Sequence, residues 1–94
     1  MAKEWPFPNV PAGPARAILA CLRAAWPEPI VLTPSRAGLE GETRDFLRAL
    51  VALQDAGWLM FETLLAGAGQ EPVGLHVVLT AKGKSELANA PGES

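Results

Sequence analysis

The sequence predicts an α+β domain, with a three-helix core followed by an antiparallel hairpin and a short C-terminal helix. Apolar residues recur at helical spacing in two stretches, 14–26 and 42–56. Gly57 follows the second stretch, where a residue in the left-handed conformation can end a helix. Two apolar runs, 58–65 and 74–79, then flank a loop that contains glycine and proline, which is typical of a hairpin.

Length and composition limit the class of protein. A chain of 94 residues makes one domain with a modest core, and an apolar content of 49% is high for such a small domain. We therefore expect part of the apolar surface to meet a partner. The single cysteine, Cys21, excludes an internal disulfide and is expected to pack rather than react. Without an apolar signal segment or a run of about 18 apolar residues, the chain is expected to be cytoplasmic and to have no membrane segment.

The first element expected is an extended arm over 1–13, because its prolines remove backbone donors and favour extended geometry. Trp5 and Phe7 stand in this arm. Their rings either fold back over the small core or dock on a second molecule, and the sequence leaves both interpretations open.

A helix over 14–26 follows. Pro14 stands at its first position, where the missing N–H is not needed, and Pro27 comes directly after its end. One face of this helix is apolar, and the opposite face carries Arg16 and Arg23. The apolar face consists of Ile18, Leu19, Leu22, Ala25 and Trp26.

A brief strand is expected at 30–32, and Thr33 then caps a second helix over 34–39. A glycine-containing turn at 40–41 leads into the third helix, 42–56. A short helix, a tight turn and a longer helix together make a helix-turn-helix arrangement.

The hairpin is expected to span 58–79. Thr80 then caps a last helix from 81 to about 90, and the tail 91–94 frays. His76 is interpreted as an exposed strand residue, because no second metal ligand stands at a suitable spacing. The core positions predicted for the whole domain are Ile18, Leu22, Phe46, Leu50, Leu53, Leu59, Phe61, Leu75, Val77 and Leu79.

Two segments resemble signatures of a known family. Residues 50–59, LVALQDAGWL, and residues 79–83, LTAKG, are similar to segments of bacterial winged-helix regulators of the multiple-antibiotic-resistance and phenolic-acid-repressor kind. The resemblance covers about 14–90 and rests on core and cap positions. It implies a winged helix-turn-helix fold, with a wing of two or three antiparallel strands, and a role in transcription regulation. In that family the central helix lies in the major groove of double-stranded DNA, and the wing reaches phosphates or the minor groove.

This resemblance implies which residues would bind DNA. Arg44 and Arg48 stand one turn apart on the outer face of the central helix, with Thr43 at its start and Arg36 in the helix before it. An arginine in such a position pairs with guanine or holds a phosphate. The alternative is a solvated helix face on which Asp45 and Arg48 form a weak surface pair.

The charge distribution argues against strong DNA binding. The net charge is −2, without the basic excess of most nucleic-acid-binding domains. Glu40, Glu42 and Asp45 surround the start of the central helix, where they suit the helix dipole but repel phosphate. Glu71 is the only charge in the loop between the wing strands. A second function therefore stays open, that of a protein-interaction module with little DNA affinity, in which the aromatic arm binds the partner.

Two further expectations concern assembly and chemistry. The chain has three tryptophans, Trp5, Trp26 and Trp58, which is more large ring area than one small core is expected to bury. We therefore expect a homodimer that buries at least one of them, through the arm or the first helix. An enzyme is not expected, because the sequence has no nucleophile with its base, no paired carboxylates and no phosphate-binding loop. No cofactor and no metal are expected either.

Overall fold

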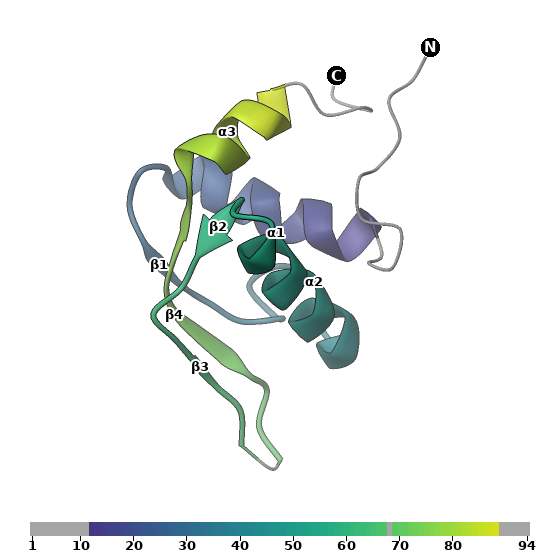
Figure 1. Cartoon of the computed structure of the whole chain (residues 1–94). Coiled ribbons are helices and arrows are strands. Elements are labelled where there is room, and N and C mark those ends of the chain that lie inside the picture. The colour runs from purple at the N-terminus through teal and green to yellow at the C-terminus, as the bar shows by residue number, and fades with distance from the viewer. Residues whose placement is uncertain (1–11, 68, 89–94) are drawn as a thin grey trace.

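The computed structural model describes residues 12–67 and 69–88. This part of the chain is a small α+β domain with three helices and a four-stranded antiparallel sheet (Figure 1). The elements, in chain order, are α1 (Ala12–Ala25), β1 (Ile30–Leu32), α2 (Thr43–Asp55), β2 (Leu59–Met60), β3 (Thr63–Leu65), β4 (Val73–Leu79) and α3 (Ala81–Ala88). None of the helices in these ranges is both long and apolar enough to cross a membrane.

The extended arm expected over 1–13 falls mostly outside the described residues, and Trp5, Phe7 and the predicted C-terminal tail lie outside them too. Where the arm can be compared, the prediction is wrong, because α1 already begins at Ala12. The helix can start before Pro14 because a proline is tolerated in the first turn, where a backbone N–H has no intrahelical acceptor.

Strand β4 lies at the centre of the sheet. It pairs antiparallel with β1 on one side and with β2 and β3 on the other. The first hairpin strand, expected over 58–65, is split into β2 and β3, and both keep the same register with β4: Leu59 lies opposite Leu79, and Leu65 lies opposite Val73. The predicted antiparallel pairing of the hairpin is confirmed.

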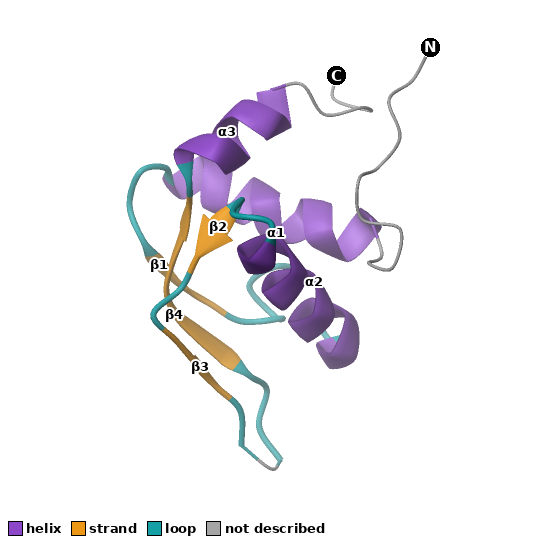
Figure 2. Cartoon of the chain, viewed as in Figure 1, coloured by secondary structure: helices purple, strands orange, loops and turns teal. Residues whose placement is uncertain are grey.

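The helices gather on one side of the sheet, and the hydrophobic core fills the space between them (Figure 2). The largest fully buried hydrophobic side chains come from α1, α2 and the sheet. They are Ile18, Leu19, Leu22, Leu32, Phe46, Leu50, Leu53, Leu59, Val77 and Leu79. The predicted core positions are confirmed except for Phe61 and Leu75, which are half-buried.

Leu75 turns away from the core because β4 contains a bulge. The β4 residues Gly74 and Val77 pair with β1 residues that are only two apart in sequence, so Leu75 and His76 together lie opposite Val31. His76 has a φ angle of +56°, in the left-handed region that few residues with a side chain adopt. The extra residue interrupts the alternation along β4 and turns Leu75 to the outer face of the sheet.

The predicted second helix, 34–39, is wrong, because residues 34–38 form a single turn. Gly38 has a φ angle of +76°, and the backbone N–H of Leu39 donates to the carbonyl oxygen of Pro34 at 2.7 Å. This hydrogen bond across a left-handed residue is the pattern that closes a helix. The segment therefore ends after one turn, and α2 is the one complete helix of the predicted pair.

Helix α2 ends at the predicted glycine. Gly57 has a φ angle of +82° and donates its N–H to Gln54 at 2.9 Å, while the N–H of Trp58 reaches the carbonyl oxygen of Leu53 at 2.9 Å. Both bonds satisfy carbonyl groups of the last helical turn. The predicted helix over 42–56 agrees with α2 within one residue at each end.

Thr80 caps α3 and joins it to the end of α2. Its hydroxyl oxygen accepts a hydrogen bond from the N–H of Gly83 at 2.9 Å and donates one to the carbonyl oxygen of Gly57 at 2.5 Å. A Cβ atom on Gly83 would lie 1.9 Å from the carbonyl oxygen of Trp58, so only glycine fits there. The predicted cap at Thr80 is confirmed, and the glycine has a packing role.

Candidate nucleic-acid interface

Arg44 and Arg48 lie on the exposed face of α2. The opposite face of the helix enters the core through Phe46, Ala49, Leu50 and Leu53. Because the two arginines are four residues apart, they lie next to each other along the helix surface. Within the described part of the chain neither forms an ion pair, and the pair between Asp45 and Arg48 that was the alternative interpretation does not form. This face therefore presents two guanidinium groups to solvent without a carboxylate partner among the described residues.

The start of α2 adds a hydroxyl group and three carboxylates. Thr43 is the first residue of the helix and is exposed. Glu42 occupies the cap position without a side-chain hydrogen bond, and Glu40 is exposed in the preceding turn. Asp45 is half-buried in the first helical turn. The carboxylates favour the helix through its dipole, and they lower the attraction of this helix end for a phosphate.

Arg36 is held apart from the arginines of α2. Its Nη1 atom donates a hydrogen bond to the carbonyl oxygen of Val31 at 2.8 Å, which directs the side chain toward β1. Its backbone N–H donates to Thr33 Oγ1 at 3.1 Å. The structure thus brings Thr43, Arg44 and Arg48 together on one helix, and it places the guanidinium group of Arg36 against the edge strand.

The loop between β3 and β4 is tied to the turn that precedes α2. The hydroxyl of Ser35 donates a hydrogen bond to Glu71 Oε2 at 2.7 Å. In Figure 1 the β3–β4 ribbon extends beyond the helices. Sequence reasoning did not identify Ser35, because nothing in the local pattern signals a contact with a residue 36 positions away.

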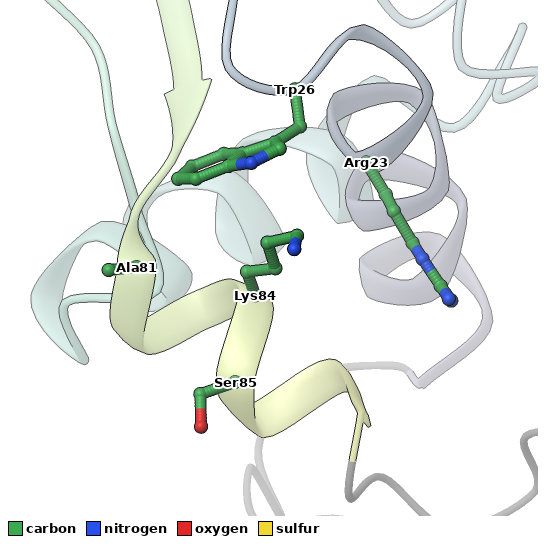
Figure 3. A pocket seen from close by; sticks show the side chains of 5 residues that line it. All are labelled: Arg23, Trp26, Ala81, Lys84 and Ser85. Carbon is green, nitrogen blue, oxygen red and sulfur yellow. The ribbon is translucent and has the colours of Figure 1, made fainter.

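A basic and aromatic surface lies between α1 and α3 (Figure 3). Lys84 Nζ is 5.7 Å from the centre of the Trp26 ring, a distance suited to a cation–π contact. The hollow beside them has a volume of about 350 Å³ and is also lined by Arg23, Ala81 and Ser85. In Figure 3 the guanidinium group of Arg23 and the hydroxyl of Ser85 point away from the indole. In most small-molecule sites a few polar groups converge on one point. The polar groups of this hollow do not converge in that way.

His76 is exposed, as predicted, and pairs with a residue of the connection between β2 and β3. Its Nδ1 atom lies 2.8 Å from Glu62 Oε1, and both side chains are 65% exposed. Among residues 12–67 and 69–88, no three His, Cys, Asp or Glu side chains are placed to share a metal ion. The described residues thus offer the exposed face of α2 as the most distinct candidate site.

Comparisons of the chain with protein-family models, with curated proteins and with solved structures each found no match. The function is therefore inferred from the geometry and charge of the domain itself.

Proposed function

We propose that the protein is a winged-helix DNA-binding domain, used as a small transcriptional regulator, and that α2 is the helix that reads double-stranded DNA. The observation that carries this proposal is the pair Arg44 and Arg48, exposed one turn apart on α2 with no carboxylate partner among the described residues. Arginine is the residue that most often recognises guanine, and it holds phosphate equally well.

The arrangement of the sheet supports the winged-helix proposal. The order β1-β4-β2, with β3 also paired to β4, joins a short strand before the reading helix to a hairpin after it. The hairpin would serve as the wing. The departure from the usual pattern is the turn 34–38, which stands where a complete helix would precede the reader. The single turn still gives the chain before α2 a defined conformation, because Gly38, in the left-handed region, ends the turn with a hydrogen bond from Leu39 to Pro34.

The charges around α2 set the expected strength of binding. Each arginine that neutralises a phosphate releases a counterion and strengthens binding at low salt. The exposed Glu40 and Glu42 at the helix start, and Glu71 in the ribbon loop, reduce the number of favourable phosphate contacts. We therefore expect a single domain to bind duplex DNA with a dissociation constant in the micromolar range or weaker.

Fluorescence anisotropy of a labelled duplex of random sequence, titrated with the protein at about 50 mM and about 200 mM salt, tests this function. If Arg44 and Arg48 both contact phosphates, the logarithm of the affinity should fall with the logarithm of the salt concentration with a slope near −2, since each contact contributes about −0.9. No binding at the lower salt concentration, at protein concentrations up to about 1 mM, would contradict the proposal.

A protein-interaction module is the second candidate. The observation that favours it is the acidic ribbon loop, where Glu71 stands at the position from which a wing would meet phosphate. In this case Trp5 and Phe7, which lie outside the described residues, would anchor the partner, since aromatic anchors supply much of the energy at interfaces. Replacing both by alanine would then abolish capture of the partner and leave DNA affinity unchanged.

A further inference from the structure

A second hollow adjoins the one beside Trp26 and Lys84. It has a volume of about 500 Å³. The residues that line it are Arg16, Ala20, Arg23, Ala24 and Leu87. Because Arg23 lines both hollows, the two follow one another along the seam between α1 and α3 (Figure 3). We call this surface the α1–α3 groove, defined as the residues that line the two hollows.

The charges of the α1–α3 groove have one sign. Its charged side chains are Arg16, Arg23 and Lys84, and no carboxylate among the described residues lines either hollow. Glu28 and Glu86 are the acidic residues nearest to these three in sequence, and neither belongs to the lining. A concave surface lined by charges of one sign concentrates ligands of the opposite sign. The groove is therefore complementary to an acidic ligand, although the chain as a whole is acidic.

The groove also has an apolar floor. Ala20 and Ala24 stand one turn apart on α1, where their small side chains leave room, and Leu87 closes the hollow from α3. A volume of about 500 Å³ lies within the range of about 300 to 1,000 Å³ that is common for binding cavities. Trp26 adds a half-buried indole, whereas Trp58 is only 6% exposed and is covered by its own domain. An apolar side chain therefore fits beside the cationic groups.

The cationic groups are spread along the groove, which favours an extended ligand over a compact one. Arg16 and Arg23 are seven residues apart, so their Cα atoms are separated by about 10.5 Å along the axis of α1. Lys84 stands on α3, on the other wall. An extended peptide advances by about 3.3 Å per residue, so carboxylates three residues apart match the spacing of the two arginines.

Two features favour a peptide over a nucleic-acid strand. The ammonium group of Lys84 is 5.7 Å from the centre of the Trp26 ring, and in Figure 3 the lysine side chain lies under the indole. A base would have to displace the lysine to stack on that face, whereas a carboxylate can pair with the lysine where it lies. The floor formed by Ala20, Ala24 and Leu87 suits an aliphatic side chain, which a peptide has and a nucleic acid lacks.

We propose that the α1–α3 groove binds an acidic peptide segment of a partner protein. Its carboxylates pair with Arg16, Arg23 and Lys84, and one of its apolar side chains enters the hollow that Ala20 and Ala24 line. A second copy of this chain is a poor occupant, because a two-fold contact would place the cationic surface against itself. No residue of α2 lines the groove within the described part of the chain, so the proposal does not rest on DNA binding.

A synthetic peptide tests the groove. The probe is a fluorescein-labelled peptide of about ten residues, with glutamate at every third position and leucine and serine between. Anisotropy titration with the full chain at about 50 mM salt should give a dissociation constant on the order of 100 µM, since the contact is smaller than a standard interface. Replacing the glutamates by glutamine, or the leucines by serine, should weaken binding at least roughly fivefold. No binding of the probe at about 1 mM protein, or equal binding of either replaced peptide, would overturn the proposal.

Charge reversal on α3 locates the site. Lys84→Glu should weaken binding of the probe at least roughly fivefold, because repulsion replaces attraction. Lys82→Glu is the matched control, since Lys82 is also exposed on α3 but lies beside Gly57 and lines neither hollow. It should change the affinity less than about twofold. Circular dichroism verifies that both variants are folded. Equal losses for the two variants would show that the probe responds only to overall charge, against the proposal.

An NMR titration of the wild-type chain gives a readout that needs no variant. The indole N–H of Trp26 and the backbone amides of 84–87 should shift as the probe is added, while the amides of Arg44 and Arg48 keep their positions. Shifts on α2 in place of the groove would overturn the proposal. A thymidine oligonucleotide of about ten nucleotides, added in competition, should leave the probe bound. If it displaces the probe and shifts the same signals, the groove binds nucleic acid and the proposal is wrong.

Discussion

The hydroxyl of Ser35 donates a hydrogen bond to the carboxylate of Glu71, with 2.7 Å between the two oxygens. This bond joins the turn before α2 to the loop of the β3–β4 ribbon, and it fixes a negative charge in the part of the domain that approaches DNA in the proposed function. A bond to a charged acceptor is stronger than one between neutral groups, although solvent weakens it at this exposed position.

Glu71→Gln should raise the affinity for duplex DNA, because it removes the negative charge and keeps an oxygen that can accept the hydrogen bond from Ser35. The gain is expected to be up to about 1 kcal/mol at low salt and to shrink as salt is added. Anisotropy titrations at two salt concentrations measure it. Ser35→Ala, which removes the bond but keeps the charge, is the control. An unchanged affinity for Glu71→Gln would show that the ribbon loop lies away from DNA.

Gly83→Ala should destabilise the domain by about 3 kcal/mol or more, since the added Cβ would lie 1.9 Å from the carbonyl oxygen of Trp58 and α3 would have to move. Urea unfolding followed by tryptophan fluorescence gives the change in the free energy of unfolding. Gly13→Ala is the matched control, because a Cβ at Gly13 in α1 meets nothing within 4 Å. That variant should be as stable as the wild type or slightly more stable. Equal stability of both variants would contradict the packing described for α3.

Thr80→Ala should cost about 1 to 2 kcal/mol, because it removes the cap of α3 and the hydrogen bond to the carbonyl oxygen of Gly57. Thr80→Ser keeps the hydroxyl and should lose little stability. Chemical denaturation of the two variants, side by side, measures the difference. If Thr80→Ser is as unstable as Thr80→Ala, the methyl group and not the hydroxyl holds this junction.

Much of the fold could be predicted from local signals. The strand 30–32, the helix 42–56 and the helix stop at Gly57 were read from spacing and residue type, because in each case the local preference agrees with the final packing. The turn 34–38 was taken for a helix because Thr33 and Pro34 have the form of a cap and a first-turn proline, while in the structure Gly38 closes the segment after one turn.

The bulge in β4 could not be predicted in this way. Glycine is the usual signal for a left-handed residue, and here the residue at +56° is His76. The bulge is visible only in the register of β4 against β1, and these two segments are more than 40 residues apart in sequence. Its consequence for Leu75, which lies outside the core, needed the structure.

The candidate site was predictable in part. Helical spacing placed Arg44 and Arg48 on the outer face of α2, and the structure agrees. Arg36 was grouped with them because the sequence gives no sign of its hydrogen bond to the carbonyl oxygen of Val31. A side chain that turns back onto its own edge strand is a tertiary contact, and spacing along the chain does not encode it.

The central claim, that α2 reads DNA, is tested most directly by comparing two double variants in the same anisotropy titration. Arg44→Ala with Arg48→Ala removes the proposed contacts, and Arg16→Ala with Arg23→Ala removes the same total charge from α1. The account predicts that the α2 variant loses about 1 to 3 kcal/mol of binding free energy for each arginine and that its salt slope flattens by about two, while the α1 variant binds nearly as the wild type does. Equal losses for the two variants, or tight binding that survives the α2 substitutions, would contradict it.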